Sequence, residues 1–257
     1  MINAKDSKGT FYLLNQKNKT PIVLIHGVGL NHQIWQPQIN YFDNTTLAYD
    51  ILGHGKTSLK KSKISFDDFT SQLLNLIDEL KFKKMHLVGF SIGSLIARNF
   101  ATKYNQRLAS LTLLCSVFRR NKEQQQIVND RFELSKKNRS LSKETLKRWF
   151  SNKYLEKNRD IYNKISSMIE QNNIDNFLKI YELFVKHKDE EDFKKITVKT
   201  LIITGENDIG STPEMSKNLS NQISNSKVKI ICKGKHLCGI EYSDDVNNII
   251  REHIENE

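Results

Sequence analysis

The sequence is poor in cysteine and contains no long apolar run. Its three cysteines, Cys115, Cys232 and Cys238, are odd in number and show no C-x-x-C spacing. This pattern suggests neither a disulfide framework nor a zinc site, so a reducing cytoplasm is the expected location. No apolar run approaches the length that spans a membrane, and the first residues lack the charged-then-apolar order of a signal peptide. We therefore expect a soluble, cytoplasmic protein with no membrane partner.

The sequence also lacks a basic motif rich in aromatic residues, although it carries 40 Lys and Arg against 29 Asp and Glu, a formal net charge of +11. An excess of that size raises the question of nucleic-acid binding. The lysines, however, stand in short groups such as "LKKSK" and "KFKK", and acidic residues are interleaved with these groups. We interpret them as a solvated surface and expect no nucleic-acid partner.

Proline and glycine are absent from one long segment, residues 118–195. This segment is polar, has almost no β-branched runs, and consists of stretches with helical character. Strand-like runs precede it and return after it, at "ITVKTLIITG". We therefore predict an α/β core formed by residues 1–117 and 196–257, with residues 118–195 inserted as a helical lid.

Six short apolar runs, rich in β-branched residues, fill the predicted core: residues 21–27, 45–50, 85–90, 108–116, 199–205 and 227–234. They are continuous rather than alternating in polarity, which is typical of strands buried on both faces of a parallel sheet. Helical stretches separate them. In residues 65–80 apolar side chains recur at three- and four-residue steps, and Ser65 with Asp68 predicts a capping box. The predicted fold class is α/β, with a doubly wound, mostly parallel sheet.

A serine between two glycines joins a predicted strand to a predicted helix. In "GFSIG", Ser91 has the G-x-S-x-G spacing of a nucleophile elbow, with "MHLV" before it and "SLIARNF" after it. A serine at such a turn takes a strained backbone conformation, and Gly89 and Gly93 remove side chains that would collide with neighbouring elements. A structural turn can use the same pattern, so the other parts of a catalytic site have to be found elsewhere in the chain.

A nucleophilic serine needs a base and a carboxylate that orients the base. His236 follows the last predicted strand, and Asp208 follows the strand before it, in "GEND". Glu206 is the alternative carboxylate. Ser91, Asp208 and His236 each stand at the carboxyl end of a predicted strand or in the loop after it, the edge at which open α/β sheets bind ligands. We predict that these three residues form a catalytic triad.

The oxyanion that forms in such a reaction needs two backbone N–H donors. Ile92 follows the nucleophile at the start of a helix, where N–H groups are unpaired. Val28 lies in "HGVG", where Gly27 and Gly29 allow the backbone to turn its N–H inward. We predict that the N–H groups of Ile92 and Val28 form the oxyanion hole. The residues imply no metal ion and no cofactor.

The sequence resembles the α/β-hydrolase superfamily over essentially its whole length. The blocks that carry the resemblance are "LIHGVGLNHQIWQPQ", "YDILGHGKTS", "GFSIGSLIARNFA", "LIITGENDIGSTPE" and "GKHLCGIE". Within the superfamily, "HGVGLNHQIWQPQ" and "LKRWFSNKYL" look most like 3-oxoadipate enol-lactonases and related carboxylic-ester hydrolases. In that group a lid tryptophan lies near the substrate, and Trp149 is the matching position. Trp149 also fits the packed face of a helix, so both interpretations stay open at this point.

The resemblance implies a serine hydrolase that cleaves a small carboxylic ester or lactone through an acyl-enzyme on Ser91. Serine rather than aspartate at the elbow argues against the haloalkane dehalogenase and epoxide hydrolase branches. C–C bond hydrolysis, acyl transfer and cofactor-free perhydrolysis stay open, as does a ligand receptor on a hydrolase scaffold. Arginines in the predicted lid favour an anionic acyl group, and a charged surface explains them equally well. They are Arg119, Arg120, Arg131, Arg139, Arg148 and Arg159.

Overall fold

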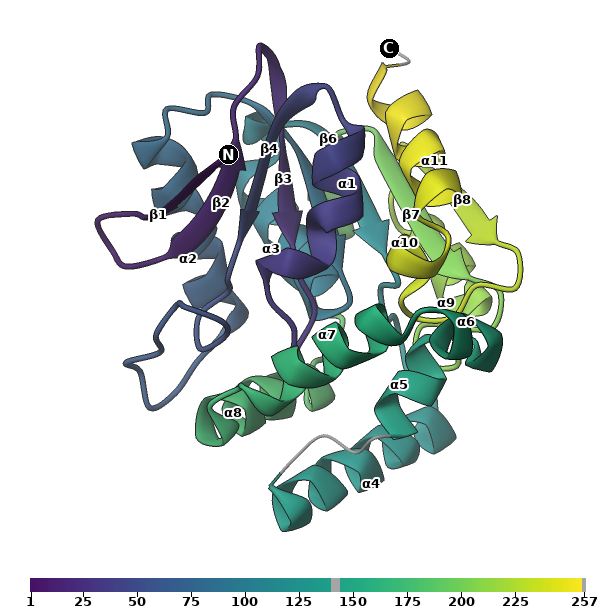
Figure 1. Ribbon diagram of the computed structural model, residues 1–257. Coiled ribbons are helices and arrows are strands. Elements are labelled where there is room, and N and C mark those ends of the chain that lie inside the picture. Colours follow the sequence, from purple (N-terminus) through teal and green to yellow (C-terminus); the bar gives the residue numbers. More distant parts are fainter. Residues whose placement is uncertain (140–143, 256–257) are drawn as a thin grey trace.

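An eight-stranded sheet forms the centre of the computed structural model, which describes residues 1–139 and 144–255. Residues 140–143, inside the predicted lid, and residues 256–257 lie outside the described residues. The strand order is β1-β2-β4-β3-β5-β6-β7-β8 (Figure 1). The strands are β1 (Ile2–Lys5), β2 (Phe11–Asn15), β3 (Lys19–Ile25), β4 (Asn44–Tyr49), β5 (Met85–Phe90), β6 (Leu108–Leu114), β7 (Thr200–Gly205) and β8 (Ser226–Ile231).

The sheet is mostly parallel, which confirms the predicted fold class. Every neighbouring pair from β4 to β8 in the strand order is parallel, whereas β2 pairs antiparallel with both β1 and β4. Neither β1 nor β2 is among the strands predicted from the sequence. The first is four residues long and mostly exposed, so no apolar run marks it.

Helices cover both faces of the sheet (Figure 1). On one face, α1 (Gln36–Tyr41) and α11 (Ser243–Glu255) contribute to the same hydrophobic cluster. On the other face, α2 (Phe66–Glu79), α3 (Ile92–Tyr104) and α9 (Pro213–Ser220) contribute to a second cluster. This double layer is expected, because the strands between the two sheet edges are buried on both faces and need helices on each side.

The last strand, β8, departs from the predicted burial. It lies at an edge of the sheet, and Lys227 and Lys229 are exposed along it. Charged side chains on an edge strand discourage pairing with another sheet. The prediction of burial on both faces is therefore wrong for β8, because the composition of a run does not tell whether its strand has one neighbour or two.

Within the described part of the chain, five α-helices stand between β6 and β7. They are α4 (Lys122–Asn138), α5 (Glu144–Trp149), α6 (Asn152–Lys157), α7 (Arg159–Glu170) and α8 (Ile174–Val185). Figure 1 shows them gathered beyond one end of the sheet. We refer to residues 118–195 as the helical segment, and its separation into a lid domain stays a prediction. No helix in the described ranges is both long enough and apolar enough to cross a membrane.

A sharp turn joins β5 to α3 at Ser91. Ser91 has a φ of 55° and a ψ of −119°, in the positive-φ region that favours glycine. A Cβ on Gly89 would come within 2.2 Å of the backbone oxygen of Gly93, and a Cβ on Gly93 within 2.4 Å of the backbone oxygen of Ile25. The elements β3, β5 and α3 therefore meet so closely that neither glycine position has room for a side chain.

We expect Gly93→Ala to lower the free energy of unfolding by about 3 kcal/mol or more, because its Cβ would displace the backbone of β3. Gly9→Ala is the matched control. An added Cβ at Gly9 meets nothing within 4 Å, and its positive φ alone should cost about 1 kcal/mol. Urea unfolding followed by circular dichroism measures both variants, and equal losses would contradict the close approach at Gly93.

Candidate active site

Three side chains from three loops meet beyond the ends of β5, β7 and β8. Ser91 stands between β5 and α3, Asp208 follows β7, and His236 follows β8, just before α10 (Cys238–Glu241). His236 Nε2 lies 3.2 Å from Ser91 Oγ, and His236 Nδ1 lies 2.7 Å from Asp208 Oδ2. The three residues that the sequence analysis assigned to a triad are thus brought together, with the imidazole between the hydroxyl and the carboxylate.

Asp208 is buried, and both of its carboxylate oxygens are engaged. Oδ2 faces His236, while Oδ1 accepts hydrogen bonds from the backbone N–H groups of Gly210 at 2.8 Å and Ser211 at 3.0 Å. Burial alone would raise the pKa of Asp208. The charge of His236, its hydrogen bond and the two backbone N–H groups nevertheless hold that pKa below its usual value. The carboxylate therefore stays ionised and aimed at the imidazole.

His236 is held in a form that binds a proton readily. Burial alone would lower the pKa of its imidazole, but the negative charge of Asp208 and the hydrogen bond to it raise that pKa above its usual value. The ring packs against Phe90 with 4.9 Å between centroids, and the backbone oxygen of His236 accepts a hydrogen bond from the Cys115 thiol at 3.2 Å. This arrangement suits a base that removes the proton of a neighbouring hydroxyl.

The alternative carboxylate, Glu206, lies elsewhere. Its Oε2 accepts a hydrogen bond from the backbone N–H of Lys233 at 2.8 Å, on the exposed surface. Asp208, the preferred of the two carboxylates, is the one that contacts His236.

The predicted oxyanion donors lie close to Ser91. Ile92 is the first residue of α3, and Val28 lines the same cavity as Ser91. His54 fixes the loop that carries Val28, because its Nε2 accepts a hydrogen bond from Gly29 N at 2.8 Å. Burial lowers the pKa of His54 to about 3, so it stays a neutral acceptor. Among the described residues, the N–H groups of Val28 and Ile92 donate no hydrogen bond, and their role as oxyanion donors stays a prediction.

A cavity of about 160 Å³ lies against Ser91 and His236. Its walls come from the helical segment and from the loops after β3, β5, β7 and β8. Apolar side chains provide much of this wall, among them Ile127, Val128 and Phe184. A cavity with apolar walls and a few polar groups at one place is the usual form of a small-molecule site.

Trp149, at the end of α5, lies at this cavity. Its ring centroid is 6.2 Å from that of His236, and its backbone oxygen accepts a hydrogen bond from Leu237 N at 2.9 Å. The side chain is half-buried and also packs against the hydrophobic cluster that includes Phe150. Trp149 therefore lines the cavity and also packs against this cluster, and its contact with a substrate stays a prediction.

Three arginines give the cavity a positive wall. Arg120, Arg131 and Arg148 line it, whereas the other three arginines of the helical segment do not. Burial lowers the pKa of Arg148, and the charge of Arg131 lowers it further, which shows that these like charges repel. In the described lining of the cavity, Asp208 is the one carboxylate, and it is already hydrogen-bonded to His236. No carboxylate of this lining is therefore left to pair with the three arginines.

Arg120 is held by backbone groups rather than by an acid. One terminal nitrogen donates to the backbone oxygens of Phe184 and Val185 at 3.3 Å each, and the guanidinium lies 4.6 Å from the ring centroid of Phe184. The other terminal nitrogen is buried and has no partner among the described residues. Burial lowers the pKa of Arg120 to about 10, yet it stays charged at neutral pH.

Several residues that line the cavity are not among the site residues predicted from the sequence. Tyr181 and Phe184 come from α8, whose apolar pattern does not tell which side chains meet the core and which meet a cavity. Ile209 also lines the cavity although it is 62% exposed. Its place next to Asp208 was the one signal in the sequence that pointed to it.

Comparison with known proteins agrees with the resemblance seen in the sequence motifs. The family model described as "alpha/beta hydrolase fold" matches residues 20–241. A curated relative from Acinetobacter baylyi, (E)-2-((N-methylformamido)methylene)succinate hydrolase, is 25% identical over 96% of this chain and 94% of the relative. The 3-oxoadipate enol-lactonase 2 of the same organism is 20% identical over 97% of this chain and 94% of that protein.

Solved structures show the same fold. The enol-lactonase of Burkholderia xenovorans LB400 has a TM-score of 0.83 at 21% identity and covers 96% of this chain and 97% of its own. An esterase from Exiguobacterium antarcticum has a TM-score of 0.87 at 18% identity, with 99% of both chains covered.

We expect His236 to titrate above pH 6.5 and Asp208→Asn to lower its pKa, because burial then acts without the opposing negative charge. Long-range ¹H–¹⁵N NMR of the imidazoles measures both values. His86 is the internal control, since burial lowers its pKa to about 4 and Asp208 does not contribute. A wild-type His236 that titrates at or below 6.5 would contradict the coupling.

The same pair should add stability over a defined pH range. The lowered pKa of Asp208 contributes stability above 3.8 that is lost as the pH falls through its folded-state pKa. The raised pKa of His236 contributes stability below 6.5 that is lost as the pH rises through its folded-state pKa. The difference in unfolding free energy between wild type and Asp208→Asn should therefore be largest between pH 3.8 and 6.5. A difference that does not vary with pH would count against the ion pair.

Proposed function

The chain belongs to the alpha/beta hydrolase fold family, and from that premise we propose that it is a serine hydrolase of small esters or lactones that carry a carboxylate. The observation that carries the proposal is the Ser91–His236–Asp208 arrangement, which faces a cavity with a positive wall. The residues named in the steps below are part of this proposal.

In the first half of the reaction, Ser91 Oγ attacks the acyl carbonyl carbon while His236 Nε2 takes the hydroxyl proton. The N–H groups of Ile92 and Val28 donate to the oxygen of the tetrahedral intermediate. Asp208 stabilises the imidazolium. The bond from the carbonyl carbon to the leaving oxygen then breaks, and His236 gives its proton to the leaving alcohol or enol.

In the second half, water cleaves the ester that the acyl group forms with Ser91. His236 removes a proton from the water as its oxygen attacks the acyl carbon. The same N–H groups hold the second oxyanion. Collapse of this intermediate releases the acid and returns the proton to Ser91.

The carboxylate of the substrate is inferred from the arginines of the cavity. Arg131 and Arg148 repel each other where solvent is limited, and Arg120 adds a third positive charge to the same wall. An anion bound beside these arginines offsets their charge. The names of the relatives agree with this inference, since succinate and 3-oxoadipate are both carboxylates. Trp149, which lines the cavity beside His236, would contact the acyl group.

We expect Ser91→Ala to abolish the hydrolysis of p-nitrophenyl acetate, since loss of the nucleophile costs about 10⁶-fold in kcat in serine hydrolases. Release of p-nitrophenolate, followed by absorbance, measures it. Ser216→Ala is the matched control, because Ser216 is also buried, lies on α9 and does not line the cavity. Equal turnover by wild type and Ser91→Ala would rule out the proposed nucleophile.

We expect Arg131→Gln and Arg148→Gln each to lower kcat/KM for mono-p-nitrophenyl adipate by about ten- to a hundredfold, the loss expected for one charge-assisted hydrogen bond. Hydrolysis of p-nitrophenyl hexanoate, which has the same length but no carboxylate, should change little. Arg159→Gln removes the same charge from the helical segment outside the cavity and serves as the control. Equal effects on the two esters would contradict recognition of the carboxylate.

A further inference from the structure

One buried arginine contacts both ends of the helical segment. Arg98 lies on α3, about two turns after Ser91, and its side chain has 0% exposure. One terminal nitrogen donates to the backbone oxygen of Val117 at 2.9 Å, where the chain enters the segment. The other donates to Asp189 Oδ1 at 2.6 Å and Glu191 Oε1 at 2.8 Å, where the chain leaves it.

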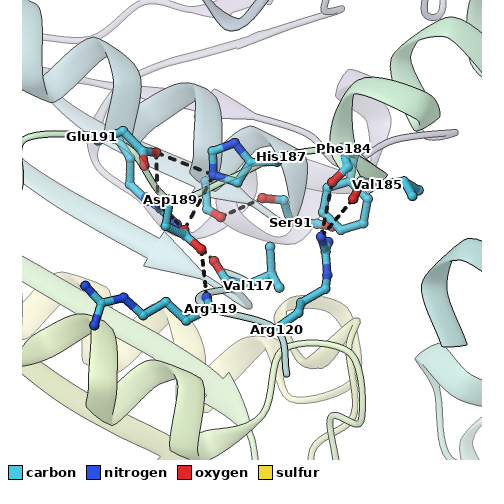
Figure 2. Close-up of polar contacts among 11 residues, drawn as sticks. Ser91, Val117, Arg119, Arg120, Phe184, Val185, His187, Asp189 and Glu191 are labelled. Carbon is cyan, nitrogen blue, oxygen red and sulfur yellow. Dashed lines mark hydrogen bonds and ion pairs between the residues drawn. The ribbon is translucent and has the colours of Figure 1, made fainter. Parts of the chain in front are cut away.

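The two ends of the segment also bind each other beside Arg98. Asp189 Oδ2 accepts a hydrogen bond from the backbone N–H of Arg119 at 2.7 Å, at a residue whose φ is +47°. The next residue, Arg120, donates to the backbone oxygens of Phe184 and Val185. Figure 2 shows these contacts side by side: Asp189 at the Arg119 backbone, and Arg120 reaching toward Phe184 and Val185.

These charges are shielded from water. The side chains of Asp189 and Glu191 are 10% and 8% exposed. The guanidinium of Arg98 lies 4.9 Å from the ring centroid of Phe193 and 5.8 Å from that of Phe118. Burial alone would raise the pKa of Asp189, but its contacts with His187, Arg98 and the Arg119 N–H hold that pKa well below its usual range. The carboxylate of Asp189 is therefore held as an ion beside the Arg98 guanidinium.

A metal ion is a competing explanation for this cluster. His187, Asp189 and Glu191 offer ligand atoms close enough together to hold one. However, one terminal nitrogen of Arg98 already contacts an oxygen of each carboxylate. The cation that these two acids face is the guanidinium, and a divalent ion beside it would meet a second positive charge.

We propose that Arg98 is a positioning residue that fixes both ends of the helical segment to the helix of the nucleophile, and so sets where the wall of the cavity stands over Ser91. Arg98 itself does not line the cavity. It acts through its neighbours, since Val117 is three residues before Arg120, and Arg120 and its partner Phe184 both line the cavity. An arginine suits this task because its planar fork can bind several oxygens in fixed directions.

The test uses variants that keep the site folded. Arg98→Gln alone leaves two buried carboxylates without a cation, which destabilises a fold strongly. The informative variant is therefore the triple change Arg98→Gln, Asp189→Asn, Glu191→Gln, which removes all three charges and keeps the shapes of the two acidic side chains. Arg98→Lys keeps the charge but not the fork. The control is Arg107→Gln, because Arg107 pairs with Asp78 and binds the backbone of Phe82 outside the helical segment.

The first readout is the fluorescence of Trp149, which needs no activity. The other tryptophan, Trp35, is 2% exposed, so quenching by acrylamide reports mainly on Trp149. In the triple variant we expect the quenching constant to rise about twofold, because the segment leaves its place over His236 more often. Arg98→Lys should fall between wild type and the triple variant, and Arg107→Gln should match wild type.

The second readout rests on the proposed function. We expect kcat/KM for mono-p-nitrophenyl adipate to fall by up to about a hundredfold in the triple variant. A loss of this size is typical when a group that binds the substrate is displaced. Hydrolysis of p-nitrophenyl acetate should fall far less, since Ser91, Asp208 and His236 are held by loops of the sheet.

A triple variant that melts cooperatively and keeps both the wild-type quenching and the wild-type ratio of the two esters would overturn the proposal. So would an increase in the melting temperature of the wild type on addition of Mn²⁺ or Zn²⁺ that Glu191→Gln abolishes, because a metal would then hold the cluster. If the wild type hydrolyses neither ester, the proposed function fails, while the quenching experiment still decides the role of Arg98.

Discussion

The close approach of β3, β5 and α3 at Ser91 is the constraint on which the rest of the structure depends. Gly89 and Gly93 leave no space for a side chain, so the direction in which α3 leaves the sheet is fixed by backbone contact. That one helix then presents the hydroxyl of Ser91 and the free N–H of Ile92 at its start. Two turns later it carries Arg98 to the ends of the helical segment. The candidate nucleophile and the candidate anchor of the cavity wall are therefore placed by the same element.

The buried charged groups form clusters that differ in their ratio of positive to negative side chains. Asp208 and His236 form a pair that favours the ionised form of each, and Arg98 is matched by two carboxylates. The cavity at Ser91 has three arginines in its described lining, and the one acid there, Asp208, is already engaged by His236. A surplus of one sign in a partly closed space lowers the free energy of an incoming ion of the other sign. The positive wall thus favours a substrate with a negative charge, and Ser91 with His236 favours nucleophilic hydrolysis.

Local patterns predicted those features that depend on neighbouring residues. The capping box appears as a hydrogen bond of 2.9 Å from Ser65 N to the Asp68 carboxylate, and the run 85–90 coincides with β5. The Arg98 cluster could not be predicted, because its acidic partners lie 91 and 93 residues away and look like part of a solvated surface. The exposure of β8 likewise depends on its place at the sheet edge.

The central claim is that Ser91 forms a covalent acyl intermediate. The most direct measurement is intact-mass spectrometry of the protein after reaction with a small fluorophosphonate, followed by peptide mapping. The account predicts one adduct per chain, located on Ser91, whose formation slows strongly in Asp208→Asn because the base then loses its orienting carboxylate. An unmodified protein, or an adduct on another residue that forms equally fast in both proteins, would contradict it.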